Sequence, residues 1–238
     1  MTQHLLQGRS EKEVTWFQRR DFLHAAAAWT ALGGFATAHA QSRSNVVQLQ
    51  GDALINGSRL DSQQPIQAGD HIVTGPGATL VFVVGNSSFL VRQGSSLRVE
   101  GSASSTVIGV LRLITGAVAS VWGKGNNRKI VTPTLTAGIR GTGVYTELFS
   151  EQSERSYFCN CYGTVDVAAG TDAVESTTEY HQAFWAEAGP KAGASLSPAK
   201  KLNHTDEEME MLAKLIGERT SWQITGRKGN PTDPGYLY

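Results

Sequence analysis

The two cysteines of the chain are separated by one residue, in the stretch Tyr157-Phe158-Cys159-Asn160-Cys161. If this stretch is a β-strand, residues i and i+2 face the same side, so both thiols point in one direction. In a straight strand their Cβ atoms lie roughly 6–7 Å apart, beyond the ~3.8 Å of an ordinary disulfide, so a bridge would require a bulge. Two thiolates that converge on one soft metal ion need less distortion, and sulfur ligands favour Cu(I) or Zn.

Histidines downstream of the cysteines offer further metal ligands. His181 lies in a Tyr-His-Gln-Ala-Phe-Trp segment, and His204 directly precedes the acidic start of a predicted helix. Two cysteines and two histidines suit a tetrahedral ion, although the spacing matches no zinc-finger signature. Three interpretations of Cys159 and Cys161 therefore stay open: buried thiols without function, a disulfide, or a metal or redox site. The cofactor is correspondingly either none or a soft metal such as Zn or Cu.

Nucleophilic catalysis is a further use to which these residues could be put. Cys159 or Cys161 would be the nucleophile and His181 the base, but no nucleophile-elbow motif surrounds them. The chain also offers no pair of carboxylates placed for acid–base work in a cleft. We therefore expect no catalytic residues and a protein that is not an enzyme.

Three glycines and an arginine interrupt a strand-like run, VTPTLTAGIRGTGVYTEL, that begins at residue 131. A phosphate-binding loop would need a helix after its glycines, because the helix N-terminus supplies free N–H groups. Strand-like residues follow instead, which predicts a bulge or a close approach of neighbouring strands. Thr132 and Pro133 are expected on an edge or at the first residue of a strand, because proline cannot donate to a ladder. Arg140 is expected to contact backbone carbonyls or a carboxylate.

The elements around these residues are predicted to be strands. From Val46 to about Val167 the apolar residues come in short runs rich in Val, Ile and Leu, cut by glycines roughly every six to twelve residues. Residues 80–84 are apolar on both faces, which predicts a central strand, whereas residues 96–100 alternate and should be half exposed. The pattern predicts an all-β fold.

The tail changes character after two prolines and predicts one helix over about 206–219. Thr205 and Glu208 form a capping box at its start. Met209, Leu212 and Ile216 then share one apolar stripe with Leu215 beside them, which predicts docking on the β domain. The acidic residues of the first turn are interpreted as helix-dipole stabilisation instead of metal ligands.

The first forty residues resemble a bacterial twin-arginine export signal. The residues that match its pattern are Arg19, Arg20, Phe22 and Leu23. The alanine-rich run that follows is too poor in Leu, Ile and Val for a membrane span, and it closes on Ala38 and Ala40, a small-x-small cleavage site. Proteins exported by this route cross the membrane already folded. We expect a periplasmic or secreted protein whose fold begins near residue 41.

Charge and hydropathy exclude two classes of partner. The chain carries 21 basic and 21 acidic residues, and no basic cluster interrupts this balance, so nucleic-acid binding is not supported. No second hydrophobic run follows the leader, so we expect no membrane span in the mature chain.

The glycine–arginine segment and the runs upstream of it resemble FecR-like domains, the periplasmic sensing regions of ferric-citrate-type regulators. TPTLTAGIRGTGVY is preceded, in the family's order, by GDALINGSRL, PIQAGDHIVTGPGATLVFVV, SLRVEG and LRLITGAVASV, and together these cover about residues 46–168. The motif positions are Thr132, Pro133, Gly138, Arg140, Gly141 and Thr142. The resemblance implies an elongated, rolled or β-helix-like all-β domain over residues 41–170. A C-terminal extension over 171–238 would carry the single helix.

The chain departs from that family at its N-terminus. The regulators carry a cytoplasmic anti-sigma segment and a transmembrane helix, where this chain has the export signal of residues 1–40. We therefore expect no cytoplasmic sigma-factor partner. The resemblance implies an exported, non-catalytic binding or interaction protein that meets an envelope protein, a glycan or a small ligand. The alternative is a periplasmic metal- or redox-binding protein that uses Cys159, Cys161 and the downstream histidines.

Overall fold

The computed structural model describes residues 44–101, 108–125, 128–149, 155–191 and 194–228. The proposed export signal and its cleavage site lie outside these ranges; its residues are Arg19, Arg20, Phe22, Leu23, Ala38 and Ala40. None of the described helices is long and apolar enough to cross a membrane.

The described residues are mostly β-strand, which confirms the predicted fold class. The strands are β1 (Val46–Gln50), β2 (Ala53–Ile55), β3 (Ser58–Arg59), β4 (His71–Thr74), β5 (Thr79–Val84), β6 (Ser87–Val91), β7 (Ser96–Glu100), β8 (Val110–Thr115), β9 (Ala117–Trp122), β10 (Arg128–Val131), β11 (Thr136–Phe149), β12 (Arg155–Ala169), β13 (Asp172–Thr178), β14 (Gln182–Lys191) and β15 (Ala194–Ala199). The helices are α2 (Asp206–Leu215) and α3 (Ser221–Thr225).

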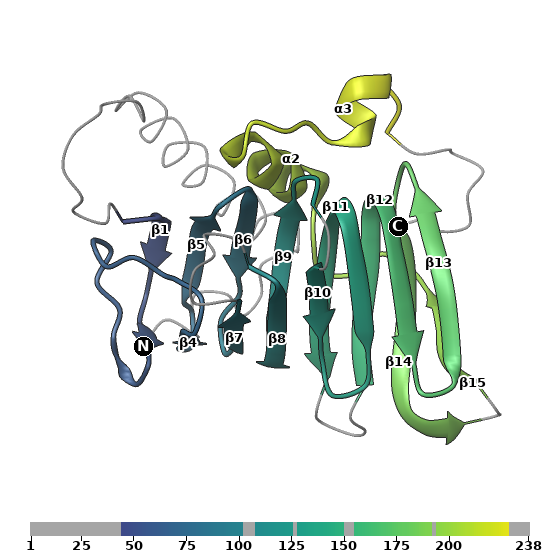
Figure 1. Ribbon diagram of the computed structural model, residues 1–238, viewed down its shortest axis with the longest axis horizontal. Helices are drawn as coiled ribbons and strands as arrows, with labels where there is room; N and C mark the ends of the chain where they lie inside the picture. The colour runs from purple at the N-terminus through teal and green to yellow at the C-terminus, as the bar shows by residue number, and fades with distance from the viewer. Residues whose placement is uncertain (1–43, 102–107, 126–127, 150–154, 192–193, 229–238) are drawn as a thin grey trace, which may run out of the picture.

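All of these strands belong to one rolled sheet, in which the order β1-β5-β6-β9-β11-β10-β8-β7-β4-β2-β3 forms the main path and β12 to β15 extend from β11. Neighbours pair antiparallel except β8 and β10, which are parallel. Figure 1 shows the strands side by side along the long axis, with α2 and α3 together over one side of the sheet.

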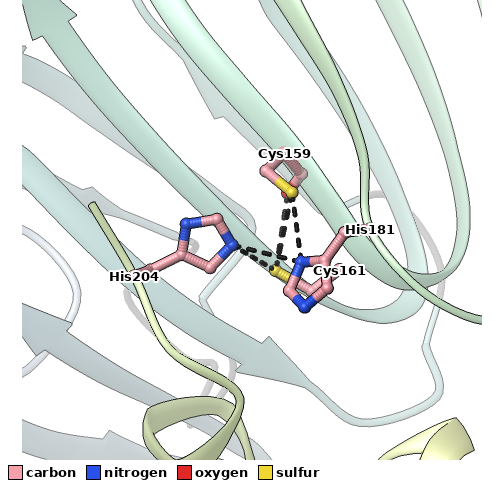
Figure 2. A group of neighbouring side chains, drawn as sticks. All are labelled: Cys159, Cys161, His181 and His204. Carbon is pink, nitrogen blue, oxygen red and sulfur yellow. Dashed lines mark hydrogen bonds between the residues drawn. The ribbon is translucent and has the colours of Figure 1, made fainter. Parts of the chain in front are cut away.

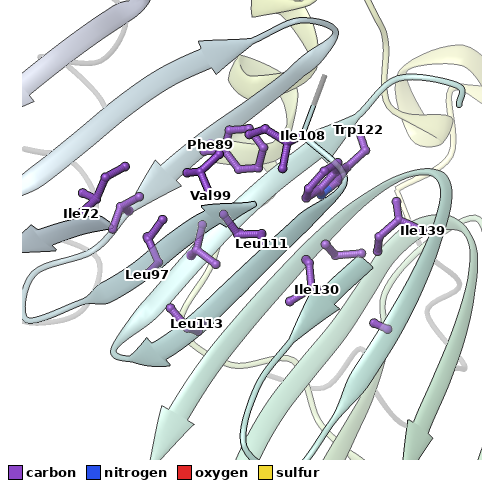
Figure 3. Packing of buried hydrophobic residues seen from close by; sticks show 14 of the residues in the cluster. Ile72, Phe89, Leu97, Val99, Ile108, Leu111, Leu113, Trp122, Ile130 and Ile139 are labelled. Carbon is purple, nitrogen blue, oxygen red and sulfur yellow. The ribbon is translucent and has the colours of Figure 1, made fainter. Parts of the chain in front are cut away.

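Two buried apolar clusters lie on opposite faces of the strands β5, β6, β9, β11 and β12. On β5, Leu80 and Phe82 belong to the first cluster and Val81 to the second, because successive side chains of a strand alternate. The first cluster joins these strands to β7 and β8 through residues such as Leu97 and Leu111 (Figure 3). A strand buried on both faces was predicted at residues 80–84, and β5 confirms it.

The second cluster lies under the C-terminal helices. Met209 and Leu212 of α2 and Trp222 of α3 are buried there against Val81 and Leu90, together with both cysteines. The predicted capping box of Thr205 and Glu208 is present. The helix ends at Leu215 and is therefore shorter than the predicted 206–219. It stops there because Gly217, at φ 75°, forms a turn before the separate helix α3. Ile216 is only partly buried.

The sheet continues beyond the boundary placed at residue 170. β13 pairs with β12 over 163–169, and β14 pairs with the same edge of β12 over 155–160. β13 and β14 therefore follow one another along one strand edge and are separated only by residues 179–181. His181 lies in this interruption, beside Cys159 and Cys161 of β12.

The glycine–arginine segment forms the first half of β11, and no helix follows its glycines. The pairing of β11 with β12 shifts between Ile139 and Thr142, and Gly141 has φ 96°, so the predicted bulge is present. A close approach is present at Gly143, where an added Cβ would lie 2.4 Å from the ring of Tyr162. Pro133 lies in the turn between β10 and β11, and not on a strand as predicted.

Candidate metal centre

A β-bulge at Cys161 brings the two thiols together. Gly143 pairs with Tyr162 and Val144 pairs with Asn160, which leaves Cys161 as the extra residue of β12. The Sγ atoms of Cys159 and Cys161 lie 4.0 Å apart, and both residues are fully buried and free of a disulfide. The sequence suggested that a straight strand would hold these side chains too far apart for a bridge and that a bridge would require a bulge; the bulge is present, and the sulfurs remain unbonded.

His181 reaches the thiols from the interruption between β13 and β14. Its backbone N–H donates to the carbonyl of Cys161 at 2.9 Å, which holds it opposite the bulge. Its φ of 31° is uncommon for a residue with a side chain and is one of three such values in the described residues. This conformation goes with a ring whose Nδ1 lies 3.4 Å from Sγ of Cys159.

His204 reaches the same point from the turn that precedes α2. Its Nε2 lies 3.4 Å from Sγ of Cys161 and 3.2 Å from Nδ1 of His181. The other ring nitrogen, Nδ1, donates to the carbonyl of Leu202 at 2.5 Å. The ring also stacks on Tyr145 with centroids 4.6 Å apart, so the orientation of His204 is set on several sides.

Asp206 orients the second imidazole. Its Oδ1 lies 3.0 Å from Nε2 of His181, and because a carboxylate only accepts, Nε2 carries the proton. Tyr180 and Lys201 hold the carboxylate in turn, at 2.9 Å from the hydroxyl and 2.5 Å from Nζ. A carboxylate behind a histidine is the usual outer-shell partner of a metal ligand, since it fixes the tautomer and raises the basicity of the free nitrogen.

The two imidazoles face one another through the ring nitrogens that make no other hydrogen bond to oxygen. Because each ring donates its other N–H, two neutral rings would place lone pair against lone pair across the 3.2 Å between Nδ1 of His181 and Nε2 of His204. Such an arrangement needs a positive charge between the nitrogens, either a proton or a metal ion.

Four of the six distances between the ligand atoms match the edges of a tetrahedral site, and the other two are at most 4.8 Å. An ion with Zn–S near 2.3 Å and Zn–N near 2.0–2.1 Å sets edges of about 3.8 Å between sulfurs, about 3.6 Å between sulfur and nitrogen and about 3.3 Å between nitrogens. The corresponding distances are 4.0, 3.4 and 3.2 Å, and all four atoms lie within 4.8 Å of one another. Figure 2 shows the two sulfurs and two nitrogens pointing to a common centre. Cys159, Cys161, His181 and His204 are thus the four residues that the sequence had grouped.

Ionisation at the cluster is uneven. Burial acts to raise the pKa of the Cys159 thiol, but hydrogen bonds from Cys161 and the charge of His204 outweigh it, so the pKa lies well below its ordinary value. Burial and the neighbouring Cys159 thiolate raise the pKa of Cys161 well above its ordinary value. For His181, burial lowers the pKa but the bonds to Asp206 and Cys159 prevail and raise it. The environment thus already stabilises one thiolate.

Cys159, His181 and Asp206 follow one another through contacts of 3.4 and 3.0 Å, but this geometry gives a substrate no access to the thiol. These three residues have the order of a nucleophile, a base and an orienting carboxylate. Cys159 is fully buried and the His181 side chain is only 5% exposed, so no substrate atom reaches the sulfur in this conformation. A closed four-ligand shell is instead typical of structural metal sites, which lack the open position of catalytic ones.

The motif residues of the glycine–arginine segment are not metal ligands in this arrangement. Arg140 pairs with Asp166 at 2.6 Å and Glu175 at 3.2 Å on the exposed side of the sheet, which agrees with the expected carboxylate contact. Thr132 accepts from the backbone N–H of Leu135 in the β10–β11 turn. Gly138 lies in β11 beside Asp166, and Gly141 forms the bulge described above.

Thr142 is the motif residue that lies nearest to the cysteines in the sheet. Its hydroxyl contacts Oδ1 of Asn160 at 3.0 Å and the carbonyl of Tyr162, on the two sides of the bulge. It therefore supports the backbone that carries Cys161. The sequence also offered Asp206, but its place in the first turn of α2 was interpreted only as a helix-dipole effect, and its contact with His181 was missed.

Comparison with known proteins does not assign this chain to a family. No protein-family model matches it, and no curated protein gives a significant match. Two solved structures are similar in part, both of a candidate anti-sigma factor from Parabacteroides distasonis ATCC 8503, at 1.65 and 2.50 Å resolution. Each is 10% identical and covers 54% of this chain, with TM-scores of 0.44 and 0.43. The matched region spans 58% of those chains.

Proposed function

We propose that this protein binds one metal ion through Cys159, Cys161, His181 and His204. The observation that carries the proposal is the convergence, within 4.8 Å of one another, of four buried ligand atoms drawn from three separate segments. Buried polar groups of this kind are costly unless they are paired, and a shared cation pairs all four at once. The role is structural or regulatory, because four protein ligands fill a tetrahedral shell and leave no position for substrate.

The charge of the site favours a divalent ion of borderline softness, such as zinc. Two thiolates and two neutral imidazoles neutralise a 2+ ion, whereas Cu(I) would leave a net negative charge inside the protein, which is costly. Asp206 does not alter this balance, because Lys201 lies 2.5 Å from its carboxylate.

The test is the metal content of the protein purified after expression of the full chain. We expect about one equivalent of zinc and, after replacement by Co²⁺, the absorption bands of tetrahedral cobalt with thiolate ligands. His71→Ala is the matched control for His181→Ala, since His71 lies in β4 and contacts Ser96 away from the cluster. Protein without metal, with two titratable thiols and normal folding, would contradict the proposal.

A thiol redox role is the second candidate, and the 4.0 Å between the two sulfurs favours it. Thiol counting separates the two functions. A metal site retains two reduced cysteines after export and releases them only to a chelator. A redox site gives a Cys159–Cys161 disulfide that reductant reverses, with no metal in either form.

The export signal and the FecR-like motifs support a periplasmic or secreted location for this protein, and we propose that it has no catalytic activity. We further propose that its rolled sheet serves binding or sensing in the cell envelope, with an envelope protein, a glycan or a small ligand as partner. Fractionation of cells that express the full chain tests the location. Co-purification from the envelope fraction tests the partner. The Cys159→Ser, Cys161→Ser variant, which lacks both thiolate metal ligands, serves as the comparison.

A further inference from the structure

The four ligands of the proposed metal site come from segments that differ in how they are held. Cys159 is paired through its backbone with Tyr145 on one side and Ala183 on the other, so it lies in the interior of the sheet. His181 is held to the same strand by its backbone bond to Cys161. His204 belongs to residues 200–228, which we call the C-terminal strap and which includes α2 and α3.

The C-terminal strap is attached to the sheet by side chains. Its backbone hydrogen bonds run within the strap, for example from Ile216 to Ala213 and from Gly226 to Trp222. Arg92 of the sheet pairs with Glu208 at 2.8 Å and donates to the carbonyl of Asn203 at 3.1 Å. Ser88 donates to the carbonyl of Leu212 at 2.7 Å. Apolar packing of α2 and α3 on the second cluster completes the attachment.

Burial makes the strap the only ligand-bearing segment that can open without breaking the sheet. Both cysteines are fully buried and His204 is 6% exposed, so an ion cannot pass in this conformation. Moving Cys159 would break strand pairing and moving His181 would break its backbone bond to Cys161, whereas moving the strap breaks the side-chain contacts described above. Local opening favours segments whose displacement leaves the strand pairing intact, and the strap meets that condition.

We propose that the C-terminal strap is the gate of the metal site: the ion enters and leaves when the strap lifts, and ligation by His204 fastens it. The inference rests on the proposed metal binding. Only the closed strap offers all four ligands, so the ion stabilises closure by mass action. Release of the ion would loosen α2 and uncover the apolar face that includes Val81, Leu90 and Val121.

The test is the rate at which the zinc-loaded protein releases zinc to excess chelator. Arg92→Ala and Ser88→Ala remove strap contacts without touching a ligand. We expect both variants to keep one equivalent of zinc. Arg92→Ala should release it at least about tenfold faster, because the variant loses the pair with Glu208 and the bond to the Asn203 carbonyl, and one charged hydrogen bond alone is enough for that factor. Arg112→Ala, which removes an exposed pair with Glu100 on another part of the sheet, should release zinc at the unaltered rate.

Hydrogen exchange gives an independent measurement. Chelator treatment should remove amide protection in α2 and α3 while β12 and β14 stay protected. Unaltered release rates in Arg92→Ala and Ser88→Ala at full zinc content would overturn the gate and leave the metal site intact. Loss of protection in β12 together with the strap would do the same. Absence of zinc from the unaltered protein would instead overturn the metal site, and the gate with it.

Discussion

Asp206 accepts a hydrogen bond from His181, with 3.0 Å between Oδ1 and Nε2, although 25 residues separate them in the chain. The bond joins the first residue of α2 to the interruption between β13 and β14. It thus connects the strap to the sheet and, at the same time, leaves Nδ1 of His181 free to bind a metal.

Asp206→Asn should weaken zinc binding by about ten- to a hundredfold, because the amide no longer fixes and polarises the imidazole of His181. Competition with a zinc indicator measures this change. Glu207→Gln is the matched control, since Glu207 occupies the next position of the same helical turn, is 47% exposed and pairs with Lys228. Equal affinities in the two variants would show that Asp206 only caps the helix.

The double variant Cys159→Ser, Cys161→Ser should bind no zinc, because hydroxyls do not replace thiolates as ligands. His181→Ala should bind zinc more weakly, and His71→Ala should bind it normally. The thermal midpoint should respond to added zinc in the unaltered protein and not in the double variant. Elemental analysis and melts with and without chelator give both results, and a zinc response that survives in the double variant would contradict the ligand assignment.

Zinc affinity should fall as pH decreases. The raised pKa values of Cys161 and His181 favour their protonated forms, with which the ion competes, whereas Cys159, with its lowered pKa, gives up its proton more readily. Each displaced proton contributes about a tenfold change in affinity per pH unit. Titrations between pH 6 and 8, with proton release measured in weak buffer, check the sign, and an affinity independent of pH would contradict it.

Gly143→Ala should destabilise the protein by about 1–3 kcal/mol, as overpacking of a close contact does. The added Cβ would lie 2.4 Å from the Tyr162 ring and 2.8 Å from the terminal methyl group of Met209, beside the bulge that carries Cys161. Gly138→Ala is the control in the same strand, because its nearest contact would be an ordinary 3.5 Å. Urea unfolding compares the two variants, and equal midpoints would count against the role of this close approach.

Replacing Arg19 and Arg20 by Lys should leave the precursor in the cytoplasm, because the twin-arginine signal is read through the arginine pair itself and not through positive charge alone. Fractionation and blotting measure the distribution. A periplasmic yield equal to that of the unaltered protein would contradict the export hypothesis. A general secretory signal fused in place of residues 1–40 serves as the control that the chain can be exported at all.

Much of the fold could be predicted from the chain alone because it depends on local pattern. Short apolar runs cut by glycines predicted strands, and the two-faced run at residues 80–84 became β5, which is buried on both sides. Thr205 and Glu208 located the start of α2, since a capping box is a contact between residues three apart. The end of the helix was placed too late because Gly217 was not recognised as a turn after Leu215.

The sequence alone predicted which residues could form the candidate site, but it did not predict how they come into contact. Cys-x-Cys and two histidines named the ligands, since few side chains bind soft metals. The bulge at Cys161, the left-handed backbone of His181 and the contact of Asp206 arise from pairing between β11, β12, β13 and β14 and from docking of the strap. Local pattern carries no information on such pairing. Only tertiary packing sets the distances and burial that bring these four residues together as a candidate metal site.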